Sequence, residues 1–366
     1  MKIEIENGKK SPAYLQLYRK ICEDIVAGVY PKGAKLPSKR NMAGELGVST
    51  VTVEHAYALL ADEGYIEPKE KSGYFVIFSN GELYSPGAPK RKLIKEQKDN
   101  GFDEKSVFPI SVLAKTMRSV ISEYREKILE KGENSGRIEL REAIADYLRR
   151  ARGMSATAEQ IVIGSGSEYL YSLVVELLGR SRRYAIESPS YNKIEEVYRA
   201  KEIEPMRLPL CEDGIESEAL WNSNADVLHI SPYRSYPSGV SASASKRHEY
   251  LRWARKGKII IEDDFESEFS VSKKTEETLF SHTENENVIY MNSFSKTISA
   301  ALRVAYMVLP KGLMKEFSAR LGFYSCTVPS FEQILISELI ANGDFERHIN
   351  RVRRSNRNKL KQLAGL

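Results

Sequence analysis

The sequence predicts an α/β protein in two parts, a small N-terminal domain of helices with a hairpin and a large domain built on a mostly parallel sheet. In the first 79 residues, helical stripes of apolar residues precede two short alternating segments. After residue 105, short apolar runs alternate with amphipathic helical segments, as in a parallel sheet covered by helices. We expect domains at 1–79 and 106–366, joined by a flexible linker at 80–105 that is rich in Pro, Gly and mixed charge.

The composition fits a globular protein of a reducing compartment. Of 366 residues, 42% are hydrophobic, which is enough for sizeable cores. The sequence has no run approaching the roughly 20 apolar residues of a membrane span, and residues 1–6 lack a signal-peptide hydrophobic region. The three scattered cysteines have neither a metal-ligand spacing nor the pattern of a disulfide framework. We therefore expect a cytoplasmic protein without a membrane partner.

The N-terminal 79 residues have the element order of a winged helix-turn-helix. Ser38 and Ser49 are good helix N-caps, and Gly64 ends the last helix. Helices are expected over 13–27, 38–46 and 50–63, and strands over 65–67 and 73–77. A helical domain that binds another protein can have the same order, so the pattern alone leaves both functions open.

Two strings in this domain resemble the GntR family of transcription regulators. Residues 36–40, Leu-Pro-Ser-Lys-Arg, match Leu-Pro-Ser-x-Arg, and residues 46–53, Leu-Gly-Val-Ser-Thr-Val-Thr-Val, match Leu-Gly-Val-Ser-Arg-x-Thr-Val. The resemblance implies binding to operator DNA through the recognition helix and the wing. It assigns DNA contacts to Ser38, Arg40, Ser49, Thr50, Thr52, Lys69, Lys71 and Gly73. Because Thr50 replaces the usual arginine, a bidentate guanine contact is lost, and the operator sequence cannot be inferred from the resemblance.

In the large domain, the string Asn-Ser-Phe-Ser-Lys-Thr places Lys296 just after an apolar run at 287–291 that predicts a buried strand. A lysine at such an edge can form an imine if burial or a neighbouring cation lowers its pKa. Ser293, Ser295 and Arg303 suit an anionic group such as a phosphate, because hydroxyl groups and a guanidinium pair well with it.

Two other apolar strands end in polar residues. The strand at 161–163 runs into Gly-Ser-Gly-Ser-Glu and a helix, so free N–H groups and the helix dipole favour an anion there, although an ordinary turn has the same pattern. Asp263 ends the strand at 259–261, where a buried carboxylate needs a cation or strong hydrogen bonds. A structural salt bridge would satisfy that need as well as a ligand would.

Together with the N-terminal domain, these segments resemble the MocR subfamily of GntR regulators, whose large domain has the fold-type I aminotransferase architecture. Residues 261–269, Ile-Glu-Asp-Asp-Phe-Glu-Ser-Glu-Phe, match Ile-Glu-Asp-Asp-Tyr-Asp-Ser-Glu-Phe. Phe-Ser-Lys follows at 294–296 and Leu-Arg at 302–303. The resemblance extends from about residue 108 to the end of the sequence.

This resemblance implies pyridoxal 5'-phosphate as cofactor, held by Lys296 through a Schiff base. Asp263 would pair with the pyridinium nitrogen and keep it protonated. Tyr191 would stack over the ring, and Tyr236 would lie beside it. The phosphate would be held by Gly166, Ser167, Ser293, Ser295 and Arg303.

Several positions depart from the family pattern. Phe265 replaces a tyrosine that donates to the phenolic oxygen of the cofactor, and Arg234 with Ser235 replaces His-Gln near the ring. Lys193 replaces an arginine that binds effector carboxylate in some members, so Lys193 and Arg234 are candidate effector contacts. The sequence ends at Leu366, in the helix that would lead to a small C-terminal subdomain, which is therefore expected to be missing.

The leading interpretation is a transcription regulator that senses pyridoxal phosphate, or an amine or amino-acid effector that exchanges with Lys296. By resemblance, it would form a head-to-tail homodimer. The first alternative is a pyridoxal-phosphate-dependent aminotransferase with a vestigial DNA-binding domain, although the changed polar groups argue against efficient transamination. The second alternative is a cofactor-free scaffold for dimerisation. The basic run at 347–361 fits a solvated helix face or a further DNA contact.

Overall fold

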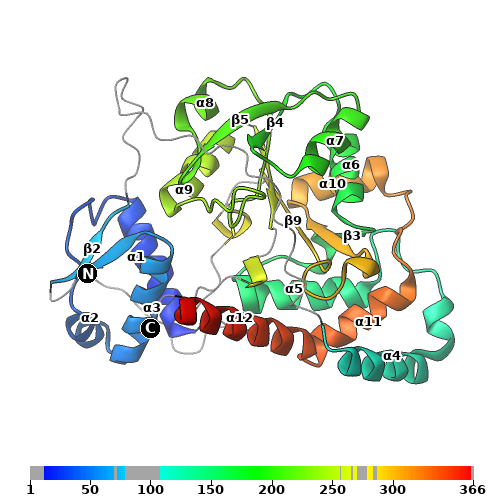
Figure 1. The fold of residues 1–366 in the computed structure, drawn as a ribbon, viewed down its shortest axis with the longest axis horizontal. Helices are drawn as coiled ribbons and strands as arrows, with labels where there is room; N and C mark the ends of the chain where they lie inside the picture. The colour runs from blue at the N-terminus through cyan, green and yellow to red at the C-terminus, as the bar shows by residue number, and fades with distance from the viewer. Residues whose placement is uncertain are drawn as a thin grey trace. The chain divides into compact units, whose positions relative to one another are not determined.

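The computed structural model describes residues 12–69, 72–78, 108–255, 257–264, 267–269, 278–282 and 287–363 (Figure 1). The chain divides into two compact units. The first comprises Met1–Lys90 with Ala242–Tyr250, and the second comprises Arg91–Ser241 with Leu251–Leu366. The linker predicted at 80–105, Lys71 of the predicted wing and Phe265 lie outside the described residues.

The first unit contains three helices and a hairpin in winged helix-turn-helix order: α1 (Ala13–Val26), α2 (Lys39–Leu46), α3 (Thr50–Asp62), β1 (Ile66–Lys69) and β2 (Gly73–Val76). Both expected N-caps are present, because Ser38 Oγ accepts from the N–H of Asn41 at 3.2 Å and Ser49 Oγ from the N–H of Thr52 at 3.1 Å. Between α2 and α3, Gly47 has a φ of 63°, which favours glycine. Apolar residues of α1 and α3 share one core.

The second unit is built on an eight-stranded sheet of order β3-β10-β9-β8-β7-β4-β5-β6. Its strands are β3 (Ile161–Gly164), β4 (Tyr184–Ser188), β5 (Met206–Cys211), β6 (Gly214–Ile215), β7 (Val227–Ile230), β8 (Ile259–Asp263), β9 (Val288–Ser293) and β10 (Ala305–Val308). The pairs between β5 and β9 in that order are parallel, whereas β10 is antiparallel to both β3 and β9, and β6 is antiparallel to β5. The predicted α/β class with a mostly parallel sheet is confirmed.

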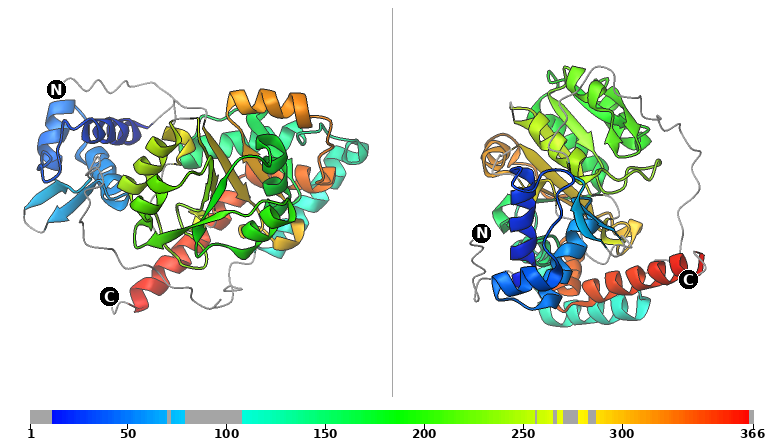
Figure 2. Two further views of the ribbon diagram at one scale, coloured as in Figure 1. Left: turned by 90° about the horizontal axis from the view of Figure 1, so that it is seen from above. Right: turned by 90° about the vertical axis from the view of Figure 1, so that its left-hand side faces the viewer.

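Helices cover both faces of this sheet (Figure 2). Their bounds are α4 (Ile110–Tyr124), α5 (Ile138–Arg152), α6 (Ser167–Leu178), α7 (Asn192–Ala200), α8 (Ser217–Asn222), α10 (Lys311–Leu321), α11 (Ser330–Ala341) and α12 (Asp344–Leu363). Another helix, α9 (Ala244–Ala254), belongs to the first unit up to Tyr250. Side chains alternate along the strands, so Tyr306 packs with α5 and α11, and its neighbour Met307 packs with α6, α7 and α10. Among the described helices, none has the length and apolar character needed to cross a membrane.

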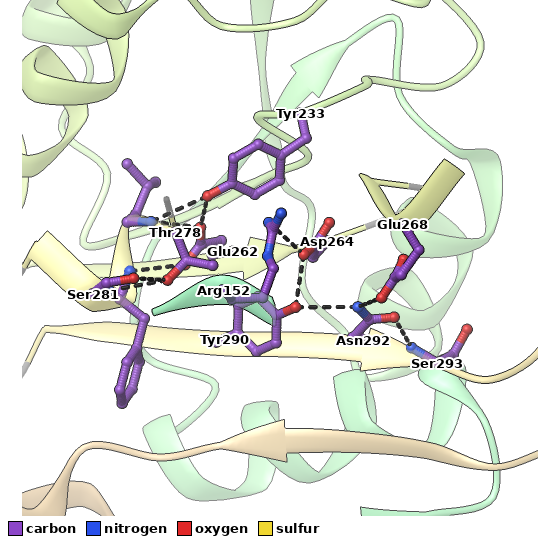
Figure 3. A network of polar contacts seen from close by, with 12 residues as sticks. Arg152, Tyr233, Glu262, Asp264, Glu268, Thr278, Ser281, Tyr290, Asn292 and Ser293 are labelled. Carbon is purple, nitrogen blue, oxygen red and sulfur yellow. Dashed lines mark hydrogen bonds and ion pairs between the residues drawn. The ribbon is translucent and has the colours of Figure 1, made fainter. Parts of the chain in front are cut away.

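A buried ion pair ties α5 to the end of β8 (Figure 3). Arg152 Nη2 lies 2.7 Å from Asp264 Oδ2, and the two side chains are 2% and 0% exposed. Tyr290 donates a hydrogen bond of 2.6 Å to the same oxygen, and the Arg152 guanidinium lies 4.8 Å from the centre of the Tyr233 ring. Opposite charges this deeply buried need each other, because neither can be hydrated.

The same network reaches the end of β9 (Figure 3). Asn292 Nδ2 donates to the Glu268 carboxylate at 2.6 Å, and Asn292 Oδ1 accepts from the N–H of Ser293 at 2.6 Å. At the other side of the network, Tyr233 donates to Glu262. Burial raises the pKa of Glu262 and of Glu268 to about 7. The network thus fixes the strand ends from which Asp263 and Ser293 are presented.

Replacement of the buried cation should destabilise the second unit strongly. In Arg152→Met, Asp264 keeps its burial but loses its partner, so we expect the free energy of unfolding to fall by about 3–5 kcal/mol. Urea denaturation followed by circular dichroism measures this loss. The matched control is Arg150→Met on the same helix, whose partner is Glu346 and whose side chain is 49% exposed; it should cost less than about 1 kcal/mol. Equal losses in the two variants would contradict the assigned role.

The buried carboxylates should also make stability depend on pH. Their folded-state pKa of about 7 lies above the ordinary value of 4.5, so between these limits the folded chain binds more protons than the unfolded chain. We expect a stabilising contribution that is complete below pH 4.5 and is lost as the pH rises through 7. Unfolding free energies across this range should fall less steeply in Glu262→Gln than in the parent protein. A slope unchanged by the substitution would refute this.

Candidate functional site

The strand register gathers three of the predicted phosphate-binding segments at one edge of the sheet. Gly164 at the end of β3 and Ser293 at the end of β9 both pair with Ala305, from the two sides of β10. The loop after β3 therefore lies next to the loop after β9, and Arg303 stands two residues before the shared Ala305. This edge is where α/β folds usually bind ligands.

Gly166 and Arg303 approach each other closely at the start of α6. Gly166 has a φ of 98°, and a Cβ added to it would lie 2.3 Å from Arg303 Nη2. The positive φ favours glycine there, and the guanidinium lies close beside the backbone. A helix N-terminus at Ser167 and a guanidinium at one place make an anion site. These residues fit the phosphate of pyridoxal phosphate.

An acidic side chain also lies beside Arg303. Glu168, in the first turn of α6, lies with Oε2 2.5 Å from Arg303 Nη2 and with Oε1 3.0 Å from Lys193 Nζ. Partial burial would raise the pKa of Glu168, but the hydrogen bonds from Arg303, its own N–H and Lys193 outweigh this effect and hold the pKa at about 2. The carboxylate is therefore ionised at neutral pH and bridges two cations.

Asp263 ends β8 as expected and is 7% exposed. Tyr171 of α6 donates to its Oδ2, and His229 Nε2 of β7 lies 3.6 Å from the same oxygen. His229 Nδ1 is in turn 2.7 Å from the hydroxyl of Tyr198. Burial and the charge of Asp263 raise the pKa of Tyr171, so this hydroxyl keeps its proton and remains a donor. The hydrogen bond from Tyr171 thus orients the carboxylate.

The other residues predicted to bind the cofactor follow strands of the sheet. Lys296 and Ser295 follow β9 and are both half-buried. Tyr191, which precedes α7, and Tyr236 meet edge to face, with ring centres 5.9 Å apart. The structure therefore brings together the two aromatic residues predicted for the ring, although they are 45 positions apart in the sequence. The side chain of Arg234, a candidate effector contact, is exposed.

The predicted DNA contacts that the structure describes lie at the starts of α2 and α3 and in the hairpin. Ser38 and Ser49 are the helix caps, Arg40 and Thr50 are exposed in the first turns, and Thr52 is half-buried with its hydroxyl 2.9 Å from Ser49 Oγ. Lys69 ends β1 and is exposed, and Gly73 begins β2 with a φ of 115°. These helix starts and the strand ends of the hairpin are the parts that a winged helix presents to DNA.

Sequence reasoning missed three residues of the large-domain site. The sequence patterns assign no role to Glu168, His229 or Tyr171. A lone histidine in an apolar strand is a usable signal, because a buried imidazole needs a hydrogen-bond partner. Tyr171 gave no such signal, since an aromatic residue on an amphipathic helix most often belongs to the core.

Comparison with known proteins assigns a family to each part of the chain. Residues 13–76 match the family of bacterial regulatory proteins, gntR family, and residues 98–365 match aminotransferase class I and II. Two solved aminotransferase structures resemble the second part. α-Aminoadipate aminotransferase LysN of Thermus thermophilus has a TM-score of 0.62 at 27% identity, covering 70% of this chain and 66% of that one. Kynurenine aminotransferase of Pyrococcus horikoshii has a TM-score of 0.60 at 25% identity, covering 68% and 64%.

Whole-chain relatives combine the same two parts. The HTH-type transcriptional regulator YdeL of Bacillus subtilis, whose function is uncharacterized, is 31% identical over 358 residues, which cover 95% of this chain and 77% of that protein. The probable rhizopine catabolism regulatory protein MocR of Rhizobium meliloti is 26% identical, covering 94% and 74%. The pyridoxine biosynthesis regulator PdxR of Corynebacterium glutamicum is 27% identical, covering 94% and 76%. The chain therefore belongs to the MocR subfamily of GntR-type transcription regulators, in which a winged helix-turn-helix is joined to an aminotransferase-like domain.

Proposed function

We propose that this regulator binds pyridoxal 5'-phosphate in its aminotransferase-like domain and uses it to sense the cofactor itself, or an amine or amino acid. The close approach of Gly166 to Arg303 at the start of α6 carries the proposal, because it builds an anion site at the strand edge that also presents Asp263. One relative, PdxR, is named as a regulator of pyridoxine biosynthesis, which is consistent with a ligand of this class.

Each residue of the site has a distinct task in the proposal. When bound, pyridoxal phosphate supplies an electrophilic carbonyl that primary amines attack. Lys296 holds the cofactor covalently, and Asp263, oriented by Tyr171, keeps the proton on the ring nitrogen. Tyr191 and Tyr236 cover the ring. The phosphate is held by Gly166, Ser167, Ser293, Ser295 and Arg303.

Sensing requires that ligand exchange alter the affinity of the winged helix for operator DNA. An amine that displaces Lys296 frees this side chain and removes a covalent tether between the loop after β9 and the ligand. The loop after β9 then has two states, one with Lys296 linked to the cofactor and one with Lys296 free. If these states favour different arrangements of the chain, an amine that converts one into the other shifts the DNA-binding equilibrium. Lys193 and Arg234 are the proposed contacts of the effector, and a head-to-tail homodimer is the proposed assembly.

The second candidate function is an aminotransferase that retains a DNA-binding domain without use. It is favoured by the fold shared with LysN and kynurenine aminotransferase and by the presence of both Lys296 and Asp263. Against it, Phe265 lacks the hydroxyl that the family pattern places near the ring, and Arg234 with Ser235 replaces two polar partners. Formation of a ketoacid from an amino acid under multiple turnover would favour this alternative.

Cofactor binding is tested by the absorption spectrum of the purified chain with added pyridoxal phosphate. We expect a visible band in the parent protein that is shifted from the band of free pyridoxal phosphate and that is absent in Lys296→Ala, because the shift comes from the imine with this amine. Lys311→Ala, at the exposed start of α10, is the matched control and should keep the band. An unchanged band in Lys296→Ala would refute the role of this lysine, and its absence from the parent protein would refute cofactor binding.

The DNA interface is tested by the salt dependence of binding to random-sequence duplex DNA. Arg40→Ala should weaken binding and lower the slope of log K against log salt by about 1, since one phosphate contact is lost. Fluorescence anisotropy at several salt concentrations measures both effects. Arg149→Ala, an exposed residue of α5 in the second unit, should leave the slope unchanged. If Arg40→Ala does the same, Arg40 does not contact the DNA backbone.

A further inference from the structure

The pairing of Glu168 with Arg303 and Lys193 has a consequence for the cofactor site. Arg303 Nη2 lies 2.5 Å from Glu168 Oε2, so the guanidinium donates to this carboxylate as it would donate to a phosphate. The other carboxylate oxygen accepts from Lys193 at 3.0 Å. One acidic side chain therefore engages both a predicted phosphate ligand and a predicted effector contact.

The position of Glu168 explains why it can replace a phosphate. It stands in the first turn of α6, where the helix dipole favours negative charge, and the same helix start forms the predicted phosphate site. The Gly166 backbone also approaches the guanidinium that Glu168 holds. A carboxylate and a phosphate at this corner would thus compete for the same hydrogen-bond donors.

We propose that Glu168 is a built-in competitor of the cofactor phosphate: its carboxylate holds Arg303 until the phosphate displaces it, after which Glu168 pairs with Lys193 alone. This inference rests on the proposed binding of pyridoxal phosphate. Its functional meaning is that Glu168 sets the affinity for the cofactor, so that binding stays reversible and responds to cofactor concentration. Glu168 acts here as a positioning residue for Arg303.

The charges at this corner support such a role. Glu168, Arg303 and Lys193 together carry one net positive charge, and a phosphate of about −2 would make the set negative while Glu168 is ionised. Lys193 can relieve this repulsion by retaining the displaced carboxylate. The side chains of Glu168, Arg303 and Lys193 are 26%, 48% and 52% exposed, so water screens each pair and the exchange of partners needs no deep burial of charge.

The test compares dissociation constants of pyridoxal phosphate in the parent protein, Glu168→Gln and Glu176→Gln. Glutamine keeps the size of the side chain and removes its charge, so we expect Glu168→Gln to bind pyridoxal phosphate about two- to fivefold more tightly. Glu176→Gln is the matched control, because Glu176 lies on the same helix and pairs with Lys201; its affinity should stay that of the parent. Absorbance and protein-fluorescence titrations measure each constant.

Pyridoxal, which lacks the phosphate, separates competition from other effects. It should bind the parent protein and Glu168→Gln with equal affinity. Equal affinities for pyridoxal phosphate would overturn the proposal and leave cofactor binding intact. Tighter binding of both ligands would also overturn it, since the phosphate would then not be the group that competes. If neither protein binds pyridoxal phosphate, the proposed function fails, and this inference fails with it.

A double-mutant cycle tests the part assigned to Lys193. In Lys193→Met, Arg303 alone holds Glu168, so pyridoxal phosphate should bind several-fold more weakly than to the parent protein. In the Glu168→Gln background the same substitution should have no effect, because the carboxylate that Lys193 receives is gone. A loss of equal size in both backgrounds would mean that Lys193 attracts the phosphate directly, and would contradict the exchange of partners.

Discussion

The pairing of β10 with β3 on one side and β9 on the other is the constraint on which the candidate site depends. Because Gly164 and Ser293 both lie opposite Ala305, the loops after two strands that are far apart in the sequence meet at one sheet edge. A shift of either strand by one residue would turn its side chains to the other face and separate these loops. Arg303 belongs to the same corner because it stands two residues before Ala305, the first residue of β10.

Two kinds of interaction then hold this edge in place. The Arg152–Asp264 pair fixes the end of β8 from inside the sheet, where breaking it would leave a charge without water or partner. The half-exposed contacts of Glu168 act at the surface, where ion pairs exchange at small cost. The scaffold of the site is thus rigid where it is buried, and its ionic contacts can exchange where a ligand would enter.

The arrangement also relates the aminotransferase-like fold to a regulatory task. Asp263 accepts a hydrogen bond from Tyr171 and lies beside His229. In the proposed function its carboxylate pairs with the ring nitrogen of the cofactor. Regulation needs binding that reports a concentration, whereas turnover needs acid–base groups placed around the reacting atoms. The retained lysine and aspartate, with changed polar residues where the family pattern places ring contacts, match the first need better.

Much of the fold could be predicted from the sequence because its signals are local. The caps at Ser38 and Ser49, the apolar strands and the Gly-rich turn before α6 are set by neighbouring residues, and the motifs around Asp263 and Lys296 identified the family. The tertiary structure alone decided which side chains meet: Tyr171 with Asp263, Tyr191 with Tyr236, and Glu168 with both Arg303 and Lys193. Glu168 is 25 positions from Lys193 and 135 positions from Arg303 in the sequence. The distances between such residues depend on strand register and helix packing, which no local pattern specifies.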